Sequence, residues 1–195
     1  MPFLSAIIST LLFLWSLFID WLLLFISPLK NPEMLWIIIP IWINWFFAEF
    51  FQEKGGTSFG NAISNGAVPL IIGIDWARYI TNQLTEGTLK FSAMIVFKYF
   101  LCLLVIIYGF TIIYYGIKAR HFVRFYGRIR EVTYVLVMFT PVIYGIVAVT
   151  WQFVLAMVLF FPLFYCLIEL IDIWVPNPKA VKSDENKEDR FSFRR

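Results

Sequence analysis

The stretch that decides the fold is residues 91–117, FSAMIVFKYFLCLLVIIYGFTIIYYGI, in which Lys98 is the only charged residue. About 20 apolar residues in a helix cross the hydrocarbon layer of a bilayer, because each residue adds about 1.5 Å. We therefore predict a transmembrane helix here. Lys98 lies about 10 Å from its start, so we expect the ammonium group to snorkel to the interface. The alternative is that Lys98 faces Asp20 or Asp75 within the membrane.

The composition extends this conclusion to the whole chain. Apolar residues make up 61% of the 195 residues, the mean hydropathy is +0.78 and charged residues make up 15%, against about 25% in soluble domains. We expect an all-α fold, a polytopic α-helical integral membrane protein with six transmembrane helices. They cover residues 4–26, 33–51, 58–80, 91–117, 132–149 and 153–174, within a transmembrane domain at 1–175.

The third segment, residues 58–80, is the least regular of the six. Its uninterrupted apolar part, residues 67–74, is eight residues long and reaches only about 12 Å as a helix. Asn65 and Gly66, followed by Pro69, disfavour an unbroken helix. We predict a crossing that is broken near Asn65 and Gly66. The alternative is a re-entrant dip, which would leave five true crossings.

The orientation follows from the basic residues. Five of the sixteen lie between positions 118 and 130, and basic loops stay on the cytoplasmic side. Residues 176–195 carry ten charges of both signs and are expected to form a disordered cytoplasmic tail. Six crossings place the N-terminus inside as well, whereas a re-entrant third segment places it outside. We expect the cell membrane as the location.

The basic loop also has a helical stripe of arginines, which is typical of a short interfacial helix that holds anionic lipid headgroups. The alternative is an ordinary positive-inside loop. The candidate contacts with anionic lipid are Lys118, Arg120, Arg124, Arg128 and Arg130.

Polar residues concentrate between positions 44 and 75, which makes this region the candidate ion- or ligand-binding site. On residues 33–51, positions 44, 48 and 52 share a helix face, and Glu49 and Glu53 stack beside them. Small residues at four-residue spacing in the third segment allow close helix packing, and amides there can bond across the contact. The alternative to a binding cavity is simple tight packing. The candidates are Asn44, Glu49, Gln52, Glu53, Asn61, Ser64, Asn65 and Asp75.

Two further pairings are expected on structural grounds. Asp75 and Arg78 are three residues apart on a helix and should form an ion pair. Glu169 and Asp172 lie at the C-terminal end of the last helix, where carboxylates oppose the helix dipole, so a cation from the basic loop is expected nearby.

The function is therefore predicted to be that of a small transport or channel-type membrane protein. The first alternative is a structural or assembly subunit of a membrane complex, and the second is a membrane-embedded enzyme that acts on a lipid. No catalytic motif is present and the chain has one histidine, so we assign no catalytic residue and expect no cofactor. From the sequence we cannot assign a bound metal. Expected partners are the bilayer and a homo-oligomer or membrane complex, with no nucleic acid.

Overall fold

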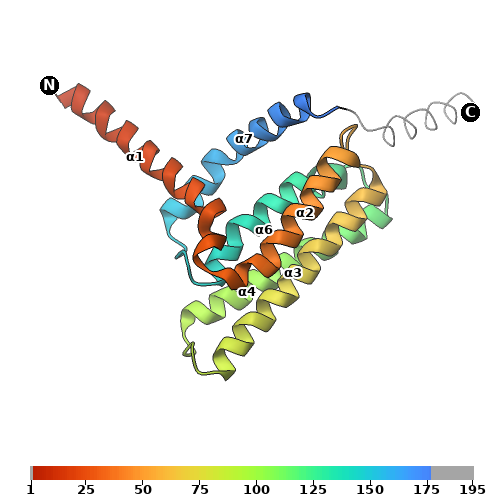
Figure 1. The fold of residues 1–195 in the computed structure, drawn as a ribbon, viewed down its shortest axis with the longest axis horizontal. Helices are drawn as coiled ribbons and strands as arrows, with labels where there is room; N and C mark the ends of the chain where they lie inside the picture. Colours follow the sequence, from red (N-terminus) through yellow and green to blue (C-terminus); the bar gives the residue numbers. More distant parts are fainter. Residues whose placement is uncertain (1, 177–195) are drawn as a thin grey trace, which may run out of the picture.

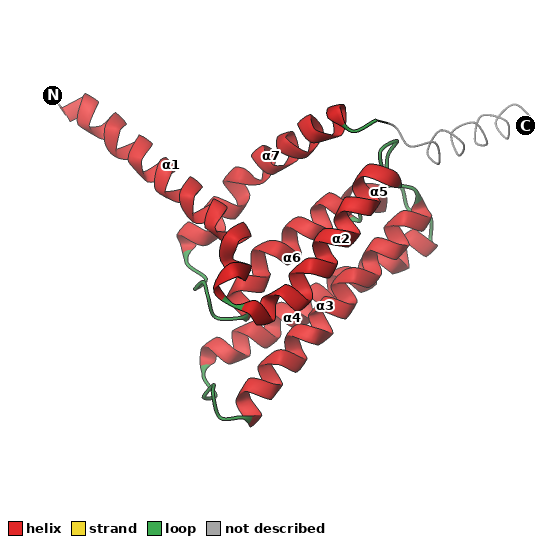
Figure 2. Ribbon diagram, viewed as in Figure 1, coloured by secondary structure: helices red, strands yellow, loops and turns green. Residues whose placement is uncertain are grey.

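The computed structural model describes residues 2–176, and within this range all regular structure is helical. Helices α2, α3, α4 and α6 run side by side as a bundle, while α1 and α7 lie against one flank (Figures 1 and 2). The predicted all-α fold is confirmed, and the predicted tail lies outside the described residues apart from Pro176. The helices are α1 (Pro2–Ile26), α2 (Leu35–Phe51), α3 (Phe59–Thr85), α4 (Ala93–Ile117), α5 (Val123–Tyr126), α6 (Ile129–Ile143) and α7 (Trp151–Trp174), with 3-10 turns at Ser27–Lys30 and Pro32–Met34.

Four of these helices are long and apolar enough to cross a membrane. They are the segments Leu4–Lys30, Pro32–Phe51, Ala93–Ile117 and Trp151–Trp174. The third and fifth predicted crossings, which correspond to α3 and α6, are not among them. α3 carries many polar residues, and the 15 residues of α6 reach only about 22 Å.

The third predicted crossing is not broken. α3 is a continuous helix of 27 residues from Phe59 to Thr85, with Pro69 inside it, so the predicted break at Asn65 and Gly66 is wrong. Its first turn is capped by the Ser58 hydroxyl, which accepts a hydrogen bond from the N–H of Asn61 at 3.0 Å. Local propensity disfavoured this helix, but packing against α4 outweighs that preference.

Glycines bring α3 and α4 into close contact. A Cβ atom on Gly109 would lie 2.6 Å from the carbonyl oxygen of Gly66, and one on Gly73 would lie 2.7 Å from the side chain of Ile106. About two turns of α4 closer to the basic loop, a Cβ on Gly116 would lie 2.6 Å from the side chain of Ile63. The two helices thus depend on glycine along much of their shared length, as close helix pairs in membranes do.

The fifth predicted helix is displaced along the chain. It was expected over residues 132–149, but α6 begins at Ile129 and ends at Ile143. Gly145 ends it by adopting a φ of +74°, and its N–H donates to the carbonyl oxygen of Val142 at 3.1 Å. Only glycine takes this left-handed conformation without strain. Arg130 and Glu131 consequently lie within the first turn of the helix and not in the loop.

Lys98 does not snorkel. Its side chain is buried on α4, and Nζ donates a hydrogen bond to the carbonyl oxygen of Ile143 at 2.8 Å. It therefore meets the C-terminal end of α6, where free carbonyl groups carry partial negative charge. Within residues 2–176 it forms no ion pair with Asp20 or Asp75.

The flank is joined to the bundle through aromatic side chains. Trp21 of α1 is buried and donates from Nε1 to the hydroxyl of Tyr134 on α6 at 3.0 Å, and its ring lies 5.6 Å from that of Phe160 on α7. In contrast, residues 4–12 of α1 are all exposed, and this half of the helix points away from the bundle (Figure 1).

Candidate functional site

Charged side chains that sequence places far apart converge at the end of the bundle where the basic loop lies. α2 and α7 end there, and α3 and α6 begin there (Figure 2). We define the acid–arginine cluster as the residues that meet at this end, which are Glu49, Glu53, Asn65, Arg128, Arg130, Glu131 and Glu169.

Glu49 is held by arginines from the start of α6. Both Glu49 and Arg130 are almost completely buried, with exposed fractions of 0% and 1%, and Arg130 Nε donates to Glu49 Oε1 at 2.6 Å. Arg128 lies 3.6 Å from the same oxygen, and Arg130 also pairs with Glu169 of α7. The second oxygen of Glu49, Oε2, is buried and has no hydrogen-bond donor among the described residues.

Glu53 is also fully buried, but its donors are neutral groups. Its carboxylate accepts hydrogen bonds from the Thr57 hydroxyl at 2.7 Å, from Asn65 Nδ2 at 2.5 Å and from the N–H of Ile129 at 3.2 Å. Asn65 Nδ2 also donates to the carbonyl oxygen of Gly127 at 2.9 Å. One carboxylate and one amide thereby connect α2, α3 and the start of α6.

Four members of the cluster were not among the predicted ion- or ligand-binding residues, namely Arg128, Arg130, Glu131 and Glu169. Arg130 was expected at lipid headgroups, yet it points into the protein and its guanidinium lies 4.7 Å from the ring centre of Tyr165. Glu131 lies outside the helix predicted over residues 132–149, yet it belongs to α6, and its Oε2 is buried without a donor among the described residues. Glu169 was expected to pair with the basic loop, and the pair with Arg130 confirms this.

The other predicted site residues lie elsewhere. Asn61 donates to the carbonyl oxygen of Gln52 at 3.2 Å on the surface, and both Gln52 and Ser64 are exposed. Asn44 is half-buried on α2 and is not in the cluster. Asp75 lies at the opposite end of α3, where Arg78 Nε donates to it at 2.8 Å as expected.

The predicted lipid contacts divide into two groups. Lys118, Arg120 and Arg124 are exposed, whereas Arg128 is half-buried and Arg130 is interior. Arg124 nevertheless has a structural bond, because its Nε donates to the carbonyl oxygen of Thr57 at 2.6 Å. The exposed part of the stripe is therefore shorter than the sequence pattern indicated.

A second polar region lies at the opposite end of the same helices. It is a pocket of about 380 Å³ formed by the start of α2, the C-terminal half of α3 and the end of α6, a volume typical of sites for small ligands. The ring of Tyr79 stacks on that of Tyr144 at 4.0 Å within it. We call it the polar pocket, and its lining residues are Glu33, Trp36, Ile37, Asp75, Arg78, Tyr79, Asn82, Gln83, Glu86 and Tyr144.

An apolar layer separates the cluster from the polar pocket. Asn65 and Asp75 are ten residues apart on α3, which corresponds to about 15 Å. Over that length α2, α3 and α6 contribute buried apolar side chains, for example Ile41, Ile72 and Val137. The interface of α2, α3 and α6 is thus polar at both ends and closed in the middle.

Searches of known protein families, curated proteins and solved structures find nothing that matches this chain. Among the described residues, no group of three or more His, Cys, Asp or Glu side chains is arranged to hold a metal ion.

Proposed function

We propose that the protein moves small cations, protons included, across the membrane along the interface of α2, α3 and α6. The observation that carries this proposal is the position of two polar regions, the acid–arginine cluster and the polar pocket, at opposite ends of one three-helix interface. In transporters, ionisable groups within the membrane face the interior of the bundle or a water-filled cavity, and access to the site alternates between the two sides.

The proposal includes six crossings, with α3 and α6 inside the membrane beside the four more apolar segments. The support for α3 is its contact with α4, which is a membrane-spanning candidate. Glycines join the two helices at Gly66 with Gly109 and at Gly73 with Ile106, and the hydroxyls of Thr81 and Tyr99 lie 2.7 Å apart further along. A helix packed along most of a spanning helix lies at the same depth.

The charges favour a cation over an anion. In the cluster, four carboxylates face two guanidinium groups, and the polar pocket holds three carboxylates and one guanidinium group. A cavity with excess negative charge and apolar walls concentrates cations. Carboxyl groups at membrane depth also serve in proton relays, and the Oε2 atoms of Glu49 and Glu131 have no donor among the described residues.

The orientation is also part of the proposal. The exposed residues Lys118, Arg120 and Arg124 favour a cytoplasmic position for this end of the bundle. The acid–arginine cluster would then face the cytoplasm and the polar pocket would face the outside of the cell. Both chain termini would lie on the cytoplasmic side of the cell membrane.

The direct test is ion flux in vesicles that contain the purified protein. One set holds a pH-sensitive dye and a second set holds a sodium-sensitive dye, and a potassium diffusion potential drives cation entry. We expect flux of at least one ion above that of empty vesicles, and a loss of at least about tenfold in Glu49→Gln, because a neutral amide cannot relay a proton or attract a cation.

Asp172→Asn is the matched control. Asp172 is a half-buried carboxylate at the same end, but it lies 3.5 Å from Lys54 and outside the cluster. Its flux should equal that of the unmodified protein. The proposal would be contradicted if the flux did not exceed that of empty vesicles. It would also be contradicted if Glu49→Gln and Glu53→Gln both kept the flux of the unmodified protein.

A second candidate function, an assembly subunit, is favoured by the outer face of α3. Gly60 and Ser64 are exposed, and a Cβ atom on Gly60 would meet only the Ser58 hydroxyl, at 3.8 Å. A leucine at position 60 fits the monomer but would block a partner helix. In this case Gly60→Leu should reduce the assembled mass measured by light scattering while the monomer stays folded. An unchanged mass would exclude this face as the interface.

A further inference from the structure

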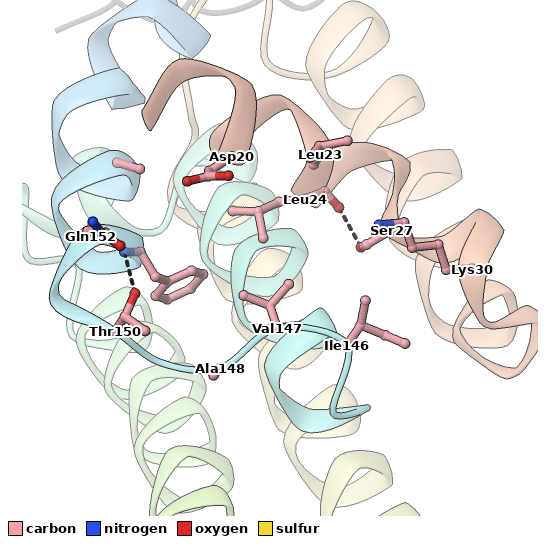
Figure 3. A pocket seen from close by; sticks show the side chains of 12 residues that line it. Asp20, Leu23, Leu24, Ser27, Lys30, Ile146, Val147, Ala148, Thr150 and Gln152 are labelled. Atoms are coloured by element: carbon pink, nitrogen blue, oxygen red, sulfur yellow. Dashed lines mark hydrogen bonds between the residues drawn. The ribbon is translucent and has the colours of Figure 1, made fainter. Parts of the chain in front are cut away.

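A separate pocket lies between the flank helices, outside the α2–α3–α6 interface. It has a volume of about 330 Å³, near the lower limit for small-ligand sites. α1, the turn that follows it, the loop after α6 and the start of α7 form its walls (Figure 3). We call it the α1–α7 pocket.

The lining of this pocket has two parts. One wall is apolar and includes Leu24, Phe153 and Ala156, all of which are buried. The other part is polar, with Asp20 and Lys30 carrying opposite charges. In Figure 3, Asp20 points from α1 toward the loop and the start of α7, while Lys30 lies on the far side of the pocket from the start of α7.

The two charged groups are available to a ligand. Within residues 2–176, neither Asp20 nor Lys30 forms an ion pair or a side-chain hydrogen bond. The nearby hydroxyls are already in use, since Ser27 donates to the carbonyl oxygen of Leu24 at 2.6 Å and Thr150 accepts from the N–H of Phe153 at 3.1 Å. Asp20 and Lys30 are the charged groups that can select a ligand, and the side-chain amide of Gln152 lines the same pocket.

We propose that the α1–α7 pocket binds a zwitterionic amphiphile, with an ammonium group facing Asp20, a phosphate facing Lys30 and an acyl chain against the apolar wall. A phospholipid with an ethanolamine headgroup has this chemistry. An anionic lipid without an ammonium group would satisfy Lys30 but leave its negative charge facing Asp20.

The position of the pocket suits a lipid. It lies at the end of the Leu4–Lys30 segment and the beginning of the Trp151–Trp174 segment, both long and apolar enough to span a membrane. Such ends meet the headgroup layer. Around it, Leu23 and Ile26 are exposed, with fractions of 40% and 49%, so an acyl chain can enter from the bilayer without crossing a polar surface.

The test is native mass spectrometry of the full-length chain in detergent, titrated with phosphatidylethanolamine and with phosphatidylglycerol of the same acyl chains. The unmodified protein should retain one phosphatidylethanolamine in preference to phosphatidylglycerol. Asp20→Asn should lower the affinity for phosphatidylethanolamine by about tenfold, the effect of losing one charge-assisted hydrogen bond. Lys30→Gln should weaken both lipids.

Two further variants separate the pocket from its surroundings. Ala148 is exposed and lines the pocket, so Ala148→Phe should block binding of either lipid without disturbing the core. Lys90 is exposed and lies outside the lining, so Lys90→Gln should bind as the unmodified protein does. Equal retention of the two lipids by the unmodified protein, or an ethanolamine preference that persists in both Asp20→Asn and Ala148→Phe, would overturn the proposal.

A competition arm identifies the source of the zwitterion. If millimolar phosphoethanolamine leaves the bound lipid in place, the acyl chain contributes to binding and the ligand is a membrane lipid. If it displaces the lipid from the unmodified protein but does not bind Asp20→Asn, the pocket recognises the same pair of charges in a soluble molecule. Displacement that is equal in both proteins would contradict the assigned role of Asp20.

Discussion

Replacement of Arg130 by methionine tests the acid–arginine cluster most severely. Methionine has a similar length but no charge, so Glu49 loses its donor at 2.6 Å and keeps only Arg128 at 3.6 Å. Because Glu49 is fully buried and Arg128 at 3.6 Å would compensate its charge only in part, the change costs about 3–5 kcal/mol of unfolding free energy. The lost contact with Glu169 adds little, since that side chain is 49% exposed and screened by solvent.

The measurement is equilibrium unfolding in mixed micelles with an increasing fraction of denaturing detergent, followed by circular dichroism. Arg130→Met should lower the unfolding free energy by about 3–5 kcal/mol, whereas Arg120→Met, at an exposed position, should change it by less than about 0.5 kcal/mol. Adding Glu49→Gln removes the buried charge that lost its main partner. The loss of unfolding free energy in the double variant should therefore be smaller, by at least about 1.5 kcal/mol, than the sum of the losses in the two single variants. Strict additivity, or a loss below about 1 kcal/mol in Arg130→Met, would refute the cluster as a coupled buried unit.

Two other contacts give predictions, each with a matched control on α3. Gly109→Ala should destabilise the protein by about 1–3 kcal/mol, because the new Cβ would lie 2.6 Å from a backbone carbonyl of α3. Gly60→Ala, in open space, should be neutral or stabilising. Equal effects of the two changes would contradict the α3–α4 contact. Asn65→Leu should cost about 2–4 kcal/mol because it removes one donor from the buried Glu53 carboxylate. Asn61→Leu removes only a surface bond and should cost less than about 1.5 kcal/mol. Thermal unfolding monitored by size-exclusion chromatography compares each pair of variants. If Asn61→Leu lowered the thermal stability as much as Asn65→Leu, the role of Asn65 as a donor to the buried Glu53 carboxylate would be contradicted.

The predicted site was partly accessible from sequence. Glu49 lies in the last turn of α2 and Glu53 lies two residues beyond its end. Helical periodicity placed the two carboxylates together, and Asn65 was expected on the facing helix. Their partners were not accessible in the same way. Arg130 is 81 residues from Glu49, and a positive-inside loop predicts which side an arginine occupies but not whether it points to lipid or to the protein.

The continuous helix α3 is a second case in which the sequence alone led to a different prediction from the structure that tertiary packing produces. Asn65, Gly66 and Pro69 each weaken a helix by local propensity, and a local rule therefore predicts a break. The structure keeps the helix because Gly66 and Gly73 allow α4 to approach closely. Packing between helices supplied the free energy that propensity lacked.

The sequence by itself determined that this chain is helical and built to meet a bilayer, because hydropathy, helix length and basic-loop charge are properties of consecutive residues. Only the tertiary structure decided which buried charges meet, how long α3 and α6 are and where Lys98 and Arg130 point. Those outcomes depend on which helices are neighbours and on how closely glycines let them approach. In a low-dielectric interior, a charge is tolerated only where such a neighbour supplies its partner.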